Sequence, residues 1–142
     1  MRVILVEDSD VNAQQFESTV RDISGIVLHR VKLLQEALVE RQDYDIAVVD
    51  LYLPDSSAEE TVAAIEQFWP MPVLVYSGSD SPEWTIAAGR SGAVGYLLKS
   101  SSQEQVVASL YCALGQALRL AAASEEQQKL REKLLRQLAR IT

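Results

Sequence analysis

Polar side chains directly follow four short apolar segments of this chain, and their types suit metal and phosphate chemistry. Short apolar runs separated by helix-like stretches are typical of buried parallel strands, and open α/β sheets bind ligands at the carboxyl ends of their strands. We therefore expect three carboxylates, one hydroxyl and one ammonium to meet at one edge of a sheet, a set that suits a divalent cation and a phosphoryl group. The runs are Val3–Val6 before Glu7 and Asp8, Ile46–Val49 before Asp50, Val73–Tyr76 before Ser77, and Val94–Leu98 before Lys99.

Strand and helix patterns alternate five times along the chain. In the first helix Ser9 or Asp10 provides a cap, apolar residues recur at steps of three and four through Ile23, and Gly25 ends the helix. Five βα units with short connections predict an α/β fold with a doubly wound parallel sheet and helices on both faces. The predicted strands are Arg2–Val6, Ile26–Val31, Asp45–Leu51, Val73–Tyr76 and Val94–Leu98.

Composition narrows the functional classes. The chain has 142 residues and a net charge of −7, which argues against nonspecific binding to nucleic acid or to an anionic membrane surface. Its single cysteine, Cys112, cannot form an internal disulfide, and no signal peptide precedes Glu7, so we expect a cytoplasmic protein. The apolar segment 106–123 carries Gln116 and Arg119 on one side, which favours a core helix over a membrane span.

The C-terminal segment differs from the rest. Residues 103–142 contain no proline and a single glycine, and 40 helical residues would span about 60 Å, twice the width of a small domain. We therefore divide the chain into residues 1–122 and a helical extension or linker, 123–142, although Ser124 with Gln127 could instead cap a separate helix. One side of the extension is apolar, which favours its burial against a second copy or an output domain. It carries Leu130, Leu134, Leu135, Leu138 and Ile141.

The motifs resemble the receiver domain of bacterial two-component response regulators. The resemblance covers about residues 1–122 and rests on motifs that are weak singly and strong in this order and spacing. It implies a five-stranded parallel sheet of order 2-1-3-4-5 with five helices, the last one extended. The motifs are Val6-Glu7-Asp8, Val49-Asp50-Leu51-Tyr52-Leu53-Pro54-Asp55, Ser77-Gly78, and Tyr96 three residues before Lys99.

The resemblance also implies roles for these residues. Asp50 corresponds to the phosphoacceptor, which takes a phosphoryl group from a histidine kinase or a phosphotransfer protein. Asp8, Asp50 and the backbone carbonyl of Tyr52 correspond to Mg²⁺ ligands, and Glu7 holds metal-bound water. Ser77 and Lys99 contact the phosphoryl group, and Tyr96 resembles the aromatic switch that turns inward as Ser77 moves. The fourth helix, fifth strand and fifth helix would form the output face.

Three positions depart from the family pattern. Ser100 replaces a proline that usually follows the lysine with a cis bond, so either this bond is trans and Lys99 is aimed differently, or a strained cis bond persists. Ala58 replaces a common glycine before the third helix, and the bulky Tyr52 lines the entrance to the site, where it would slow attack of water on a phosphoaspartate.

Other functions remain open on the sequence alone. A pseudo-receiver, which has this fold and never takes phosphate, fits Tyr52, Ala58 and Ser100. A haloacid-dehalogenase-like phosphatase would need a second acid two residues after its nucleophile, where this chain has Tyr52. We therefore expect a signalling module rather than an enzyme, with no nucleic-acid binding by this chain and no membrane partner. Tyr96 fits packing as well as switching.

Overall fold

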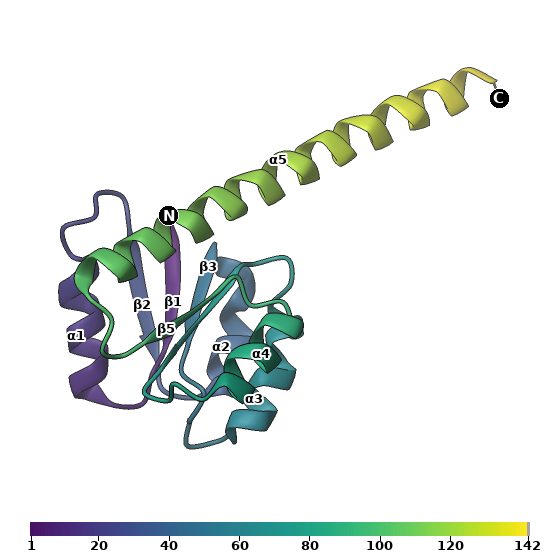
Figure 1. Ribbon diagram of the computed structural model, residues 1–142. Helices are drawn as coiled ribbons and strands as arrows, with labels where there is room; N and C mark the ends of the chain where they lie inside the picture. The colour runs from purple at the N-terminus through teal and green to yellow at the C-terminus, as the bar shows by residue number, and fades with distance from the viewer. Residues whose placement is uncertain (142) are drawn as a thin grey trace.

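A five-stranded parallel sheet organises the computed structural model, which describes residues 1–141 and leaves Thr142 and the Ile141 side chain outside the described part. The strand order is β2-β1-β3-β4-β5, as the resemblance implied (Figure 1). The elements are β1 Arg2–Val6, α1 Asp10–Val20, β2 Val27–Val31, α2 Leu34–Glu40, η1 Arg41–Asp43, β3 Ile46–Val49, α3 Ala58–Ala64, η2 Ile65–Phe68, β4 Val73–Ser77, α4 Pro82–Arg90, β5 Gly95–Leu98 and α5 Gln103–Ile141.

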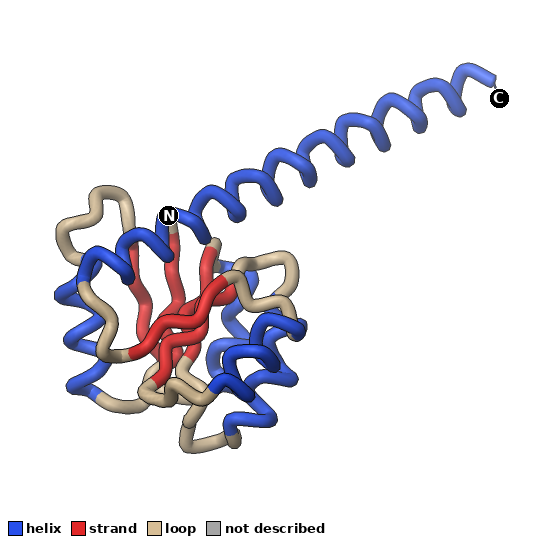
Figure 2. Tube along the Cα trace, viewed as in Figure 1, coloured by secondary structure: helices blue, strands red, loops and turns tan. Residues whose placement is uncertain are grey.

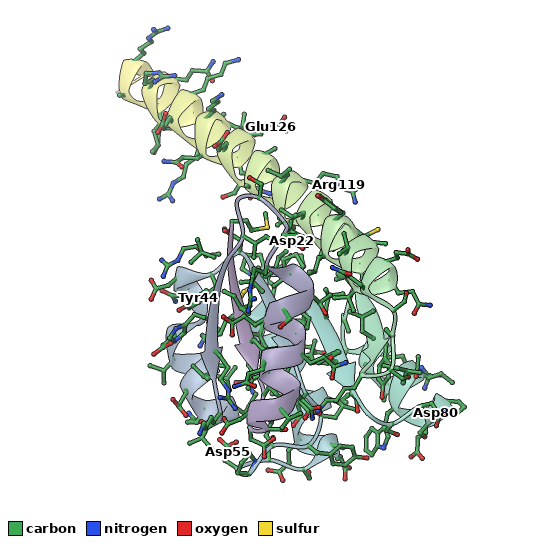
Figure 3. All side chains as sticks on the ribbon, turned by 90° about the vertical axis from the view of Figure 1, so that its left-hand side faces the viewer. Asp22, Tyr44, Asp55, Asp80, Arg119 and Glu126 are labelled. Carbon is green, nitrogen blue, oxygen red and sulfur yellow. The ribbon has the colours of Figure 1, made fainter. Side chains whose placement is uncertain are left out.

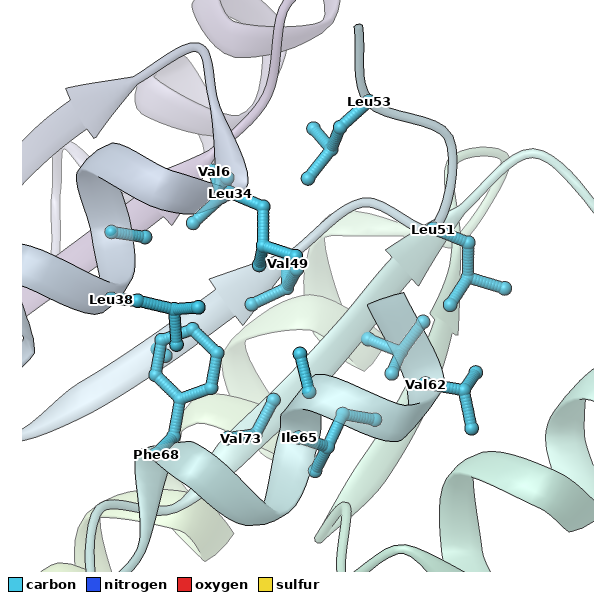
Figure 4. Packing of buried hydrophobic residues seen from close by; sticks show 14 of the residues in the cluster. Val6, Leu34, Leu38, Val49, Leu51, Leu53, Val62, Ile65, Phe68 and Val73 are labelled. Atoms are coloured by element: carbon cyan, nitrogen blue, oxygen red, sulfur yellow. The ribbon is translucent and has the colours of Figure 1, made fainter. Parts of the chain in front are cut away.

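Helices cover both faces of this sheet. α1 and α5 lie on one face, and α2, α3 and α4 lie on the other (Figures 1 and 2). On the second face, Leu38 and Phe68 pack together with Ile65 and Val73 (Figure 4). Every residue of β3 and β4 is buried, because both faces of these central strands are covered. This double burial is why the strands appear in the sequence as unbroken apolar runs.

Local capping explains where the helices begin. The Ser9 side chain accepts from the Asn12 N–H at the start of α1, and Ser57 forms a capping box with Glu60 at the start of α3. The Ser9 cap was one of two predicted alternatives, but the end of α1 differs from the prediction. The helix ends at Val20, because the Ile23 N–H turns back to the Val20 carbonyl, and Gly25 takes a φ of +86° in the turn before β2.

α5 is one continuous helix of 39 residues, so the alternative of a new helix starting at Ser124 is wrong. Its first turns bury Val106, Leu110 and Ala113 against the sheet, and from Ala121 to Arg140 every side chain is exposed. The helix then projects beyond the amino edge of the sheet (Figure 1). The division at residues 122 and 123 stays a prediction.

Among the described residues, α5 is the one helix long and apolar enough to cross a bilayer. Length and composition are weak evidence for a span, since a core helix of a water-soluble domain passes the same test.

Candidate functional site

Backbone hydrogen bonds continue past the strand ends and bring the predicted polar residues to one edge of the sheet. The Asp50 N–H donates to the Val6 carbonyl at 3.0 Å, and the Lys99 N–H donates to the Ser77 carbonyl at 2.9 Å. The Glu7 N–H likewise reaches the next strand, β2, at 3.0 Å. Parallel pairing therefore fixes the backbone of Glu7, Asp50, Ser77 and Lys99 at the same level, as the sequence predicted.

The Lys99 ammonium lies between two buried carboxylates. Its Nζ is 2.9 Å from Asp50 Oδ2 and 2.8 Å from Glu7 Oε2. Glu7 is fully buried, and Asp50 is only 4% exposed. The bond between Lys99 and Ser100 is trans, since Trp69–Pro70 is the one cis peptide among residues 1–141. Of the two alternatives the strained cis bond is therefore wrong, and with the trans bond the Ser77 carbonyl anchors the lysine backbone where its side chain reaches both acids.

Burial and charge shift the proton affinities in this pocket. Burial, reinforced by the Asp50 charge, raises the pKa of Glu7 above its usual 4.5, although Lys99 and the Ser9 N–H oppose the shift. Burial alone would lower the pKa of Lys99. Contacts with Glu7 and Asp50 outweigh that effect, so the pKa of Lys99 lies above its ordinary value and the amine stays charged.

Three carboxylates of the pocket fit a hard divalent cation. Glu7, Asp8 and Asp50 each offer one oxygen within 4.8 Å of the others, and Asp8 is exposed while its neighbours are buried. Glu7 Oε2 is buried, and its close partner is the Lys99 ammonium at 2.8 Å. A buried carboxylate oxygen that is paired with one cation and lies beside two further acids suits Mg²⁺ or a water bound to it.

The fourth predicted ligand lies on the loop after β3. The Tyr52 N–H donates to Asp50 Oδ1 at 3.3 Å, which holds this loop beside the pocket, and the Tyr52 side chain is 53% exposed. Ala58 is the first residue of α3 and is buried, so the helix begins there without a glycine. The Tyr52 carbonyl as a ligand stays a prediction.

Two residues that the sequence analysis missed hold the loops of the site. Arg30, near the end of β2, donates from Nε to the Glu7 carbonyl at 2.7 Å and pairs with Asp10 at 2.7 Å, which lowers the pKa of Asp10. Asp55 accepts from the Leu34 and Gln35 N–H groups at 2.9 and 3.0 Å and so caps α2, whose own cap position has no such side chain. A basic residue at a strand end was the available signal for Arg30.

Ser77 and Tyr96 meet at the loop between β4 and α4. Ser77 is fully buried, and its Oγ accepts from the Ser79 N–H at 3.2 Å. The Tyr96 hydroxyl donates to the Ser79 carbonyl at 2.8 Å. Burial raises the pKa of Tyr96, and its contact with Ser77 works in the opposite direction. The ring of Tyr96 is thus turned toward the loop that follows Ser77.

Figure 3 places Asp55 and Asp80, from two loops of this edge, at the end of the body away from the projecting part of α5. One further ring lies under the lysine: the Tyr76 ring centroid is 5.8 Å from Lys99 Nζ, and Tyr76 also packs edge-on against Phe16. From the sequence, Tyr76 is predicted only to be a strand residue.

Comparison with known proteins agrees with this arrangement. The family model of the response regulator receiver domain matches residues 3–111. The cell cycle response regulator CtrA of Brucella ovis is 31% identical over 114 residues, and the cell cycle transcriptional regulator CtrA of Caulobacter vibrioides is 27% identical over 114. Each alignment covers 78% of this chain and 49% of the relative, so the chain spans about half the length of these curated relatives.

The fold has solved counterparts. A signal receiver domain from Vibrio parahaemolyticus superimposes with a TM-score of 0.76 at 26% identity, over 86% of this chain and 95% of that one. The matched residues 3–111 contain all of the sheet except Arg2, and every strand end at which the acids, Ser77 and Lys99 meet. The chain therefore belongs to the response regulator receiver domain family of two-component signalling proteins.

Proposed function

We propose that this chain is a signalling receiver that accepts a phosphoryl group on Asp50 from a histidine kinase or a phosphotransfer protein. One observation carries the proposal: the Asp50 carboxylate is nearly buried, 2.9 Å from the Lys99 amine and beside the acids Glu7 and Asp8. An Asp50 oxygen would attack the phosphorus of a phosphohistidine. The new O–P bond forms as the P–N bond breaks, and its electron pair leaves with the imidazole nitrogen.

The neighbouring residues support that transfer. Glu7, Asp8, Asp50 and the Tyr52 carbonyl would hold Mg²⁺, which when bound supplies positive charge between the two anionic reactants. Lys99, held above Tyr76, would turn from the free carboxylates to a phosphoryl oxygen. Ser77, being short and at the same edge, would donate a hydrogen bond to another phosphoryl oxygen. Tyr52, exposed at the entrance, would slow attack of water on the product.

The output would pass through the loop after β4. If Ser77 moves toward the phosphoryl group, its contact with the Ser79 N–H changes, and the Ser79 carbonyl that accepts from Tyr96 moves with it. This links the pocket to the face formed by α4, β5 and α5, so phosphorylation would bias that face between two arrangements. An output domain or an effector protein would read this face, and the leucine side of α5 would contact a further partner. We place the protein in the cytoplasm, as a signalling module rather than an enzyme.

Intact-mass measurement after treatment with acetyl phosphate and Mg²⁺ tests the proposal. The wild type is expected to gain one phosphoryl group, and Asp50→Asn none. Asp80→Asn is the matched control, because Asp80 is another acid at the same end of the body and should leave the adduct intact (Figure 3). If the wild type shows no adduct, the chain is a pseudo-receiver, and an adduct that persists in Asp50→Asn would move the acceptor to another residue.

A further inference from the structure

The projecting half of α5 exposes leucines in line with a groove on the body. Leu130, Leu134, Leu135 and Leu138 are 55–60% exposed and form an apolar strip along one side of the helix. The groove, of about 500 Å³, lies where α5 leaves the amino edge of the sheet, and Trp69, 71% exposed, forms part of its wall. Groove and strip follow one another along α5, the groove ending at Ser124 and the strip beginning at Gln127.

The residues that α5 contributes to the groove and the strip follow one repeat. The central ones recur at alternating steps of three and four, which is the seven-residue repeat of a coiled-coil seam. We call this set the seam. Its members are Ala117, Leu120, Ser124, Gln127, Arg131, Leu134 and Leu138, with Ala121, Leu130, Leu135 and Gln137 flanking it.

Charged residues avoid the seam almost completely. Between residues 124 and 140, every leucine lies on the seam or beside it, and Arg131 is the one charge on it. The remaining charges occupy the outward positions of the repeat. They are Glu125, Glu126, Lys129, Glu132, Lys133, Arg136 and Arg140. A helix that ended freely in water would have no reason to segregate charge in this way, whereas one that pairs with a like helix requires it.

We propose that the seam pairs with the seam of a second copy of this chain, in parallel and in register. Parallel pairing matches like with like: Ser124 and Gln127 meet their own copies, and Leu134 and Leu138 meet theirs. An antiparallel pair would lay the polar Ser124–Gln127 end of one seam against the leucine end of the other. Parallel register also brings Leu130 beside the partner's Leu135 and turns the two Trp69 grooves toward each other, as an isologous interface requires.

Like charges repel each other in the parallel pair, so its stability is expected to depend on salt. Two Arg131 side chains meet on the seam, and the bodies lie at the same end of the pair. The chain has a net charge of −7 and residues 125–142 carry +2, which leaves −9 on each body. Both repulsions are screened by salt, so association is expected to tighten as ionic strength rises. Arg131→Leu is expected to tighten it further.

Sedimentation over a concentration series tests the seam on the full chain. The wild type is expected to dimerise, and Leu134→Glu to weaken the dimer at least tenfold. Leu118→Glu is the matched control: Leu118 is 66% exposed on the same helix but lies off the seam, so the dimer should persist. A monomeric wild type, or a dimer indifferent to Leu134→Glu, would overturn the proposal.

Cysteine cross-linking tests the orientation, in a Cys112→Ser background because the native thiol is exposed. Ser124→Cys is expected to form an intermolecular disulfide under mild oxidation, since paired seam residues lie within disulfide reach, and Lys129→Cys, which faces outward, is not. A dimer that depends on Leu134 yet gives no Ser124→Cys cross-link would overturn parallel register. The inference rests on the proposed role of the α5 leucines in partner contact and not on phosphoryl transfer. Intact mass of Leu134→Glu after acetyl phosphate treatment, measured on the same samples, distinguishes a failure of pairing from a failure of phosphoryl transfer.

Discussion

The carboxyl edge of the sheet buries charged side chains, whereas the projecting half of α5 exposes apolar ones. At the edge, Glu7 and Asp50 are carboxylates enclosed by protein, whereas along the helix Leu130 and Leu134 are apolar groups in water. The first arrangement costs desolvation and the second costs apolar hydration. In the proposed function and the proposed pairing, each cost would be removed by a different ligand, a cation or phosphoryl group at the edge and an apolar surface at the helix. Both proposals therefore place function where ordinary burial fails.

Removing the lysine from the edge is expected to cost the most stability. Lys99→Met leaves two neighbouring carboxylates without their cation, and we expect it to lower the free energy of unfolding by about 3 kcal/mol in metal-free buffer. Lys99→Arg, which keeps the charge, is expected to lose less. Urea denaturation measures both. A loss within about 0.5 kcal/mol would mean that the carboxylates do not repel each other.

Mg²⁺ should distinguish the two regions, since it is expected to act on the edge and not on the helix. At a free concentration 100 times its Kd, the ion is expected to stabilise the fold by about 2.7 kcal/mol. Asp8→Asn should reduce this gain while leaving the metal-free fold intact, because Asp8 is exposed. Thermal melts with and without Mg²⁺, against NaCl of equal ionic strength, measure the effect. Equal gains in Asp8→Asn and the wild type would remove Asp8 from the site.

Replacing Glu7 is expected to raise the free energy of unfolding of the metal-free chain, whereas replacing Lys99 lowers it. Because its pKa is raised in the fold, its contribution to stability is complete below pH 4.5 and is lost as the pH rises through the raised value. Once the pH exceeds the raised pKa, ionisation of Glu7 therefore destabilises the metal-free chain. Glu7→Gln should stabilise that chain by about 1 kcal/mol and flatten the pH dependence of unfolding above pH 4.5. Denaturation at several pH values measures both, and a destabilised variant would reverse the assigned sign.

The smallest effect belongs to the exposed leucines. At concentrations where the chain is monomeric, Leu134→Gln should change the free energy of unfolding by less than about 0.5 kcal/mol. Leu110→Ala, on the same helix but 1% exposed, should cost about 3 kcal/mol. Circular dichroism of dilute samples in urea compares them. Equal losses would show that the body depends on the seam even without a partner.

The edge was predictable from the sequence because parallel pairing leaves little freedom. Once β1, β3, β4 and β5 are adjacent, the residues that follow them must lie at one edge, so Asp50 and Lys99 meet whatever the intervening loops do. The unbroken α5 was also foreseeable, since its helical pattern contains no proline.

Contacts set by side-chain rotamers and loop geometry were not predictable in this way. Arg30 reaches the Glu7 carbonyl, and Asp55 caps a helix 21 residues earlier in the chain, contacts that no periodic pattern encodes. The trans bond after Lys99 was one of two open alternatives, because the identity of Ser100 does not reveal which neighbouring carbonyl anchors the lysine. The rotamer of Tyr96 depends on where the Ser79 carbonyl points.

The continuity of α5 has a mechanical consequence. Its first turn is four residues from Lys99, and its far tip is about 58 Å away along a single stiff rod. A tilt of about 5° at the root would move the tip sideways through about 5 Å, roughly half the diameter of a helix. A slight reorientation of the first turns on the sheet would thus arrive at the far end as a sideways displacement of several ångströms.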